Sequence, residues 1–290
     1  MTETFDSDWL ALREPFDRKA RSTALAARLA RALPVYPWLI DLGAGTGSLF
    51  RFLAPIIGGA QSWTFVDSDS ALLDAAFNVT ADWAVARGFP ITHTDSTLRI
   101  HARAGLWQMD GEIHDLADMP GELPLREADA VVCSALLDLV SQAWIDRLSR
   151  ALRVPFLAAL SVDGRDGWLP RHPADALIRA GFRRDQSRDK GFGRALGPHA
   201  AAVAMRLLAA RGFHVLSAPS DWVIPRPALA MAHALIDGTA AAARVALPAR
   251  RAAIAAWQDV RHSQSMASRL AIRIGHRDIL ALPRTGPGKG

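Results

Sequence analysis

The sequence predicts an α/β fold in which a doubly wound, mostly parallel sheet is covered by helices. The chain has 290 residues, half of them hydrophobic, which is enough for one substantial core. Short apolar segments alternate with helix-like segments of about 10–15 residues, as in parallel sheets. A glycine-rich turn directly follows the first apolar segment.

Two helices are expected before the first strand, because apolar residues recur at helical spacing over 8–31. Pro34 and Pro37 end this helical region. The apolar run 38–40 then predicts the first buried strand. Residues 1–35 are therefore expected to form an N-terminal helical cap.

The main domain is expected over residues 36–283, with a polar tail at 284–290. Region 163–211 interrupts the alternation of strands and helices, and we expect it to be a helical lid inserted between the fifth and sixth strands. The later strands are expected at 62–66, 106–114, 130–133, 156–162 and 212–216, with a hairpin or one long strand within 270–282, and the helices between them at 49–55, 70–87 and 142–152.

Charge is distributed unevenly along the chain. Residues 1–150 contain 13 Lys and Arg against 20 Asp and Glu, a net charge of −7, whereas residues 151–290 contain 21 against 9, a net charge of +12. The pI near 10.2 overstates this basicity, because three Lys, one Tyr and one Cys leave few groups to titrate between pH 7 and 10. The basic half indicates an anionic partner.

Other features indicate a cytoplasmic protein that does not enter a membrane. No apolar run approaches the roughly 18 residues of a membrane span, and the acidic start lacks the pattern of a signal peptide. The single cysteine, Cys133, cannot form a disulfide within the chain. The nine histidines show no ligand spacing, so we expect no metal.

The glycine-rich turn lies within Leu39-Ile-Asp-Leu-Gly-Ala-Gly-Thr-Gly-Ser-Leu-Phe50. Its three glycines allow a sharp turn and bring backbone N–H groups to a ligand at the start of a helix. Asp67 closes the next strand 20 positions beyond Gly47, where doubly wound folds place a carboxylate on a ribose. A dinucleotide fold would place glycine at position 48, which is Ser48.

The pattern Asp41-x-Gly-x-Gly-x-Gly resembles motif I of the class I S-adenosylmethionine-dependent methyltransferases. Three further segments are similar to this family in the same order: 65–69, 115–116 and 129–138. The resemblance covers residues 36–165 and, more loosely, the closing strands to about 283, and it implies a seven-stranded sheet of the class I type. It also implies methyl transfer with S-adenosylmethionine as cofactor and S-adenosylhomocysteine as product.

The resemblance implies a cofactor site residue by residue. Gly43, Gly45 and Gly47 would line the methionine and ribose part, with Asp41 near the ammonium group and Ser134 beside the methionine. Asp67, followed by Ser68, would hold the ribose hydroxyls, and Asp115, followed by Leu116, the adenine amino group. Asp110, Glu112 and Asp118 are alternatives to Asp115.

The acceptor is expected to be a small molecule. Residues 133–136 read Cys-Ser-Ala-Leu, not the Asn/Asp-Pro-Pro-aromatic motif of family members that methylate base amines. Val132 stands where enzymes with a cysteine nucleophile have proline, so Cys133 is expected to be a buried strand residue. RNA remains an alternative acceptor because of the basic half. A protein that binds the cofactor without methylating is a second alternative.

Substrate contacts are expected from the glycine-punctuated segment 185–198, which could also be a plain surface connection. Phe192 would contact substrate there, and Asp189 and Lys190 are candidates for a base or an anion contact; no other catalytic residue is assigned. Arg13 and Arg21 could reach a carboxylate or form an ion-pair ladder with Asp17. The cations expected to hold an anionic acceptor are Arg183, Arg184, Arg188, Lys190 and Arg194. The sequence leaves the acceptor atom and the oligomeric state open.

Overall fold

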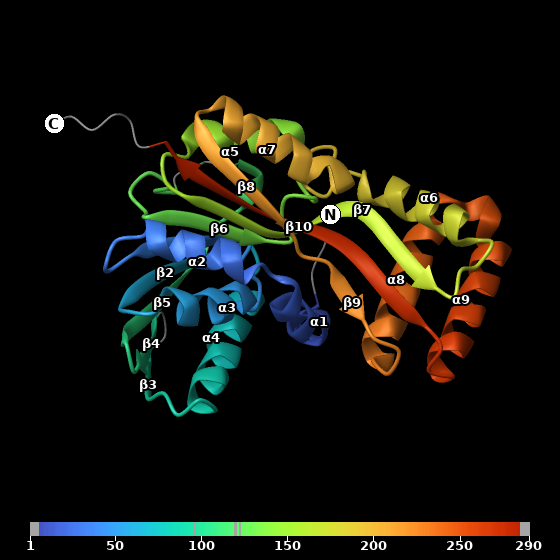
Figure 1. The fold of residues 1–290 in the computed structure, drawn as a ribbon, viewed down its shortest axis with the longest axis horizontal. Helices are drawn as coiled ribbons and strands as arrows, with labels where there is room; N and C mark the ends of the chain where they lie inside the picture. Colours follow the sequence, from blue (N-terminus) through green and yellow to red (C-terminus); the bar gives the residue numbers. More distant parts are fainter. Residues whose placement is uncertain (1–5, 95–96, 119–120, 122, 285–290) are drawn as a thin grey trace.

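The computed structural model describes residues 6–94, 97–118, 121 and 123–284. The expected tail lies outside these residues except for Arg284. Over the described residues, ten strands form one sheet in the order β3-β4-β5-β2-β1-β6-β7-β10-β8, and β9 pairs with β10 (Figure 1). The strands are β1 (Trp38–Leu42), β2 (Gln61–Asp67), β3 (Ile91–His93), β4 (Thr97–Ala102), β5 (Gly105–Ile113), β6 (Ala130–Ser134), β7 (Phe156–Leu169), β8 (Phe213–Pro219), β9 (Trp222–Ile224) and β10 (Ala271–Pro283).

The predicted α/β class with a mostly parallel sheet is confirmed. Strands β5, β2, β1, β6 and β7 are parallel neighbours, and β10 runs antiparallel between β7 and β8. These seven strands match the expected seven-stranded core. The expected count was nevertheless too low, because β3 and β4 extend the edge as an antiparallel pair on β5 and β9 adds to β10. β3 is only three residues long and partly exposed, so it has no apolar pattern to predict it.

Two hydrophobic cores lie on opposite faces of this sheet, because successive strand residues point to opposite sides. Leu39 packs into one core and Ile40 into the other, as do Leu280 and Ile279. The first core is covered by α2 (Thr23–Ala32), α3 (Ser48–Ile57) and α4 (Ser70–Val85), and the second by α5 (Gln142–Ala151) and α7 (Ala200–Ala210).

A second lobe is built where β7 and β10 continue beyond the main sheet (Figure 1). Its separate core contains residues of β7, β9, β10, α6 (Asp175–Gln186), α8 (Leu229–Ala246) and α9 (Arg251–Met266). The predicted strand 156–162 was therefore too short, and the expected insertion 163–211 begins inside β7. The stretch 163–166 is polar, so its sequence does not indicate that the strand continues. In the structure its side chains are stabilised there by ion pairs: Arg165 with Asp163 and Asp221, and Asp166 with Arg179.

A buried arginine organises the core of the second lobe. Arg261 is fully buried and forms an ion pair with Asp175 at 2.5 Å. Its guanidinium lies 5.6 Å from the ring centroids of both Trp168 and Trp257. Such a buried charge is tolerated because its partners are also held in place.

Among the described residues, no helix combines the length and apolarity needed to cross a membrane.

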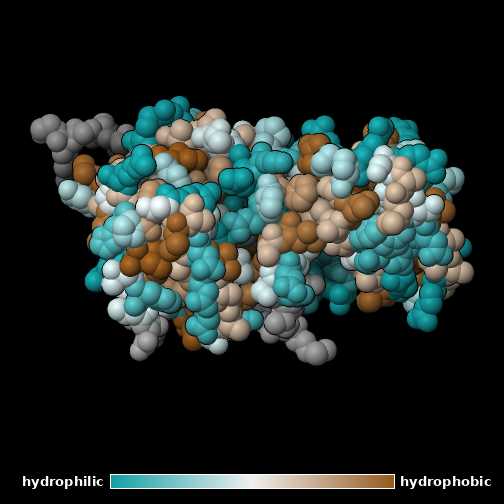
Figure 2. All heavy atoms as spheres, turned by 90° about the horizontal axis from the view of Figure 1, so that it is seen from below, coloured by the Kyte–Doolittle hydropathy of each residue, from teal (hydrophilic) through white to brown (hydrophobic). Residues whose placement is uncertain are grey.

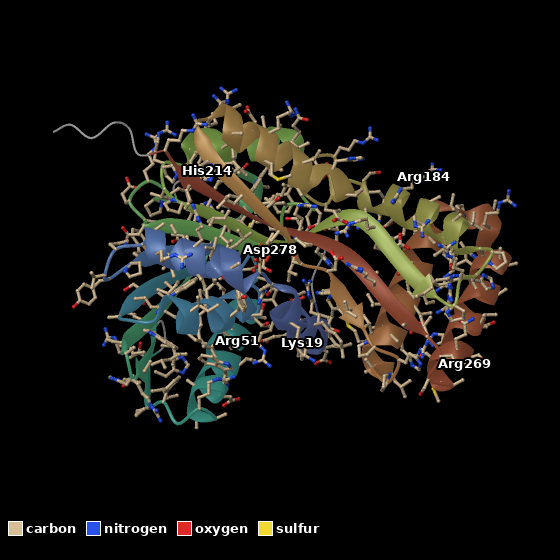
Figure 3. The ribbon with its side chains drawn as sticks, in the orientation of Figure 1. Lys19, Arg51, Arg184, His214, Arg269 and Asp278 are labelled. Carbon is tan, nitrogen blue, oxygen red and sulfur yellow. The ribbon has the colours of Figure 1, made fainter. Side chains whose placement is uncertain are left out.

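The two expected N-terminal helices are α1 (Ser7–Ala20) and α2. Arg51 of α3 holds α1 by donating from Nε and Nη2 to the carboxylate of Glu14, at 2.8 and 2.5 Å (Figure 3). Asp278 of β10 accepts hydrogen bonds from the backbone of Ser22 at 2.7 Å and Leu160 at 2.8 Å. The last strand thus fixes the start of α2 and the middle of β7.

Gly47, which precedes α3, provides a test of this packing. It has a φ of +77°, and a Cβ there would lie 2.9 Å from Cε2 of Phe65. We expect Gly47→Ala to lower the free energy of unfolding by about 2–4 kcal/mol, from backbone strain and overpacking together. Denaturant unfolding followed by circular dichroism measures this change.

Gly88→Ala is the matched control. Gly88 has a φ of +73° with open space around it, so only the backbone strain of about 1–2 kcal/mol applies. Equal losses in the two variants would contradict the assigned contact between position 47 and Phe65.

Candidate functional site

A cavity of about 390 Å³, the first cavity, opens at the carboxyl ends of β1, β2, β5 and β6. The strand order reverses at β1, and ligands of open α/β sheets bind at such points. Seven of the nine sequence-predicted cofactor residues line this cavity, from four separate strand ends: Gly43, Gly45, Asp67, Ser68, Asp115, Leu116 and Ser134.

Asp67 holds the glycine-rich turn in place. Its carboxylate accepts hydrogen bonds from the backbone N–H of Gly45 at 2.9 Å and of Asp69 at 3.2 Å. Burial raises the pKa of Asp67, and these backbone hydrogen bonds oppose that rise. The turn is also bonded to the end of β2, since the N–H groups of Gly43 and Ala44 donate to the carbonyl of Val66.

Asp41 and Gly47 do not line the first cavity. Asp41 instead lines a small cavity of about 50 Å³ that adjoins the turn at Gly43 and Gly45. Both of its carboxylate oxygens are buried without a hydrogen-bond partner among the described residues. Burial raises the pKa of Asp41 to about 8, although Arg21 nearby lowers it in part. Gly47 is the N-cap of α3 and lies close to Phe65, and its contact with a ligand stays a prediction.

Arg21 does not line either cavity, contrary to the sequence-based expectation of a substrate contact. The side chain is buried, and it donates from Nη1 to the carbonyl of Ser48 and from Nη2 to the hydroxyls of Ser48 and Ser134, all at 2.9 Å. Arg21, the C-cap of α1, therefore joins the end of α1 to α3 and β6.

The loop after β5 supplies the far wall of the first cavity. Asp115 accepts a hydrogen bond at Oδ1 from the backbone of Ala117, at 2.9 Å, which leaves its second oxygen for other contacts. Leu116 is buried, and its carbonyl accepts from Nε1 of Trp144 at 2.6 Å. The alternatives Asp110, Glu112 and Asp118 do not line this cavity.

Arg13 of α1 lines the first cavity and is nearly buried. Its Nε donates to Oδ2 of Asp17 at 3.0 Å, and Arg21 lies 3.9 Å from the same oxygen, as in the expected ladder. Oδ1 of Asp17 accepts from Nε1 of Trp222 at 2.8 Å, and the Arg13 guanidinium lies 5.0 Å from the Trp222 ring. These contacts fix α1 between the two lobes.

The segment 185–198 reaches the first cavity with two of the predicted residues. Lys190 and Phe192 line it, and Phe192 packs edge-on against Trp144, with ring centroids 6.3 Å apart. Asp189 does not: its Oδ1 accepts from the backbone of Gly191 and Gly193, at 2.8 and 3.0 Å. Oδ1 of Asp189 thus holds the turn at Gly191 and Gly193, and the role of Asp189 as a base or an anion contact stays a prediction.

Most of the other predicted substrate cations lie away from the first cavity. Arg188 forms an ion pair with Asp185, and Arg194 is exposed outside both cavities. Arg184 is exposed on α6 (Figure 3), while Arg183 donates to the carbonyl of Gly164. Arg184, Arg188 and Arg194 line neither this cavity nor the cavity between the lobes, so their contact with the acceptor stays a prediction.

A second cavity of about 420 Å³ lies between the two lobes, where the surface is hollowed (Figure 2). It shares Arg13, Ala135, Leu139 and Lys190 with the first cavity, so the two spaces adjoin. Sequence analysis missed it because the tryptophans that line it are scattered singly along the chain: Trp9, Trp168, Trp222 and Trp257.

His276 is a further residue that the sequence did not indicate. It lines the second cavity, and its Nδ1 lies 3.0 Å from the carbonyl of Ile274, which places the proton on Nδ1. Burial, reinforced by Arg13, lowers the pKa of His276 to about 4, so the ring is neutral at pH 7. No cluster of three or more metal-ligating side chains occurs among the described residues.

No family model matches the chain, and no curated protein matches it. Solved structures similar to it include a SAM-dependent methyltransferase from Thiobacillus denitrificans in complex with S-adenosylhomocysteine, with 14% identity, a TM-score of 0.46 and coverage of 97% of this chain and 100% of that one. A SAM-dependent methyltransferase from Geobacter sulfurreducens has 14% identity, a TM-score of 0.43 and coverage of 92% and 93%. The cyclopropane synthase MmaA2 from Mycobacterium tuberculosis has 11% identity, a TM-score of 0.42 and coverage of 89% and 83%. Likenesses at this level assign no function, which must be argued from the site itself.

The raised pKa of Asp41 has a consequence for stability. The pKa is about 8 in the folded protein and about 3.8 in the unfolded chain, so the folded state binds more protons between these values. Stability therefore falls as the pH rises from about 4 to 8. We expect Asp41→Asn to raise the free energy of unfolding by on the order of 3 kcal/mol at pH 8 and by clearly less at pH 5.

Urea unfolding at both pH values measures this difference. Asp74→Asn is the control, because Asp74 is exposed on α4 and should change stability little at either pH. A stability gain from Asp41→Asn that is equal at pH 5 and pH 8 would contradict the raised pKa of Asp41 in the folded protein.

Proposed function

We propose that this chain is a methyltransferase that binds S-adenosylmethionine in the first cavity and methylates a small-molecule acceptor. One observation carries the proposal: predicted cofactor residues from four strand ends converge on one cavity at the point where the strand order reverses. Because they are far apart in sequence, their convergence supports the reading of each segment as part of one site.

The residues present suit this cofactor chemically. Asp67 offers a carboxylate at the end of β2 for the two ribose hydroxyls, and Asp115 offers one for the adenine amino group. The buried oxygens of Asp41, which have no partner among the described residues, suit a nearby ammonium group. Gly43 and Gly45 have positive φ and no side chain, so the backbone can approach a ligand closely.

S-adenosylmethionine supplies a methyl group already activated by a positively charged sulfur. The chain then needs to hold the acceptor in line with that methyl group and to exclude water. Leu10, Leu139 and Phe192 provide apolar walls of the first cavity for this purpose. Arg13 and Lys190, which line both cavities, would face the acceptor.

The size of the second cavity favours a small acceptor over RNA. About 420 Å³ is within the range of small-molecule sites, and this space adjoins the first cavity directly. Several arginines of the basic half are already paired with aspartates, which reduces the charge left for phosphates. We also propose a cytoplasmic location, which the free, buried Cys133 supports.

Calorimetric titration with S-adenosylmethionine tests the cofactor site. We expect Asp67→Asn to weaken binding about 10- to 100-fold, since it removes a charged acceptor of hydrogen bonds. Asp74→Asn, on the exposed side of α4, should leave the affinity within twofold. The intact protein failing to bind, or equal affinity in the Asp67 variant and the wild type, would refute the site.

Methyl transfer itself requires a second measurement. Labelled S-adenosylmethionine incubated with the protein and cell extract should yield a labelled small molecule. Tight cofactor binding without any labelled product would instead favour a binding protein that does not methylate. Label recovered in RNA would favour the nucleic-acid alternative.

A further inference from the structure

Among the described residues, nine charged side chains line the second cavity beside five large aromatic ones, which are Trp9, Trp168, Phe182, Trp222 and Trp257. The indole rings of Trp168 and Trp222 line it and are each only 5% exposed, and Trp9 packs edge-on against Trp222 with ring centroids 6.1 Å apart. Phe182 and Ile178 of α6 line it from the other side. A space with these walls stabilises a flat, apolar ring system by burial and ring contacts.

Most charged side chains that line the second cavity are neutralised by a partner in the protein. Arg165 pairs with Asp221, and Arg179 pairs with Asp166. Asp175 pairs with Arg261, and Asp185 pairs with Arg188. These pairs need no ligand to satisfy them, so they add polarity at the rim without selecting a charge on the ligand.

At the junction between the two cavities, Arg13 and Lys190 line both spaces, and Arg13 also has a partner in the protein, Asp17. Arg13 contacts Asp17 through Nε, and none of the described residues accepts a hydrogen bond from its terminal nitrogens. A guanidinium with two such nitrogens matches the two oxygens of a carboxylate. This donor lies beside the space proposed for the cofactor.

We propose that the second cavity binds an aromatic carboxylic acid, with its ring between Trp222, Trp168 and Phe182 and its carboxylate at Arg13 and Lys190. The inference rests on the proposed function for the identity of the methyl donor. The reaction would form a methyl ester: a carboxylate oxygen bonds to the methyl carbon, the carbon–sulfur bond breaks, and its electron pair stays on sulfur. The acceptor loses one negative charge and the sulfonium one positive charge.

A carboxylate also suits the groups available for proton transfer. It carries no proton near pH 7, so no base has to remove one before attack. The imidazole in this cavity, His276, has its pKa lowered to about 4 and is a weak base. Asp138 also lines the cavity and is the residue that a hydroxyl acceptor would use instead.

Three probes of the same ring system test the proposal: 2-naphthoate, 2-naphthamide and 2-naphthol. Each is titrated calorimetrically into the full chain, both alone and saturated with S-adenosylhomocysteine, and each is incubated with S-adenosylmethionine and examined by mass spectrometry. We expect 2-naphthoate to bind at least tenfold more tightly than the other two and to yield its methyl ester. Comparable binding of the three probes would overturn the proposal.

Variants of Arg13 and Lys190 test whether the junction between the cavities causes the preference for 2-naphthoate. Arg13→Gln should reduce the affinity for 2-naphthoate at least tenfold and leave that for 2-naphthamide within about threefold. Arg194→Gln is the matched control, because Arg194 is exposed outside both cavities, and it should change neither affinity more than twofold. Lys190→Gln provides a second variant if Arg13→Gln fails to fold.

The outcomes separate this inference from the proposed function. Cofactor binding without a preference for 2-naphthoate, or with a preference that both junction variants leave intact, would overturn the carboxylate acceptor alone. Methylation of 2-naphthol that Asp138→Asn abolishes would overturn it in favour of a hydroxyl acceptor. Failure of S-adenosylmethionine to bind would refute the proposed function, whereas the preference for 2-naphthoate can be measured without that cofactor.

Discussion

The antiparallel pairing of β7 with β10 is the constraint on which the rest of the molecule depends. Both strands are longer than the main sheet needs, with 14 and 13 residues, so one end of the pair completes the sheet and the other supports the second lobe. Asp278 lies within this pair and binds the backbone of Leu160 and Ser22 (Figure 3). The second cavity lies between the two lobes that this pair of strands joins.

Charge is organised differently from what the excess of arginine suggests. Much of the basic half is neutralised internally, as in the pairs of Arg165, Arg179 and Arg261 with aspartates. The cation most suited to an anionic acceptor is Arg13, which belongs to the acidic half and is positioned by Asp17. For an anionic acceptor, the position of a cation relative to the two cavities therefore matters more than the net charge of either half of the chain.

Stability and function compete in the glycine-rich turn. Asp67 stabilises the turn through Gly45 and is also proposed to bind the ribose, so one carboxylate would serve both the fold and the ligand. Asp41 is buried without a hydrogen-bond partner among the described residues, which destabilises its charged form. A cationic ligand group nearby would offset that cost, and sites built for binding often carry such strain.

The sequence by itself determined the alternation of strands and helices, the glycine-rich turn, and acidic residues such as Asp67 and Asp115 at strand ends, because these depend on local periodicity and spacing. Only the tertiary structure decided that β7 continues through the polar stretch 163–166, since ion pairs with distant residues stabilise it there. It also decided that Arg21 supports the fold while Arg13 faces both cavities. Arg13 and Arg21 are each four positions from Asp17, so they look equivalent in the sequence. Folding distinguishes them, because Arg21 bonds to Ser134 of β6 whereas Arg13 packs against Trp222 of β9.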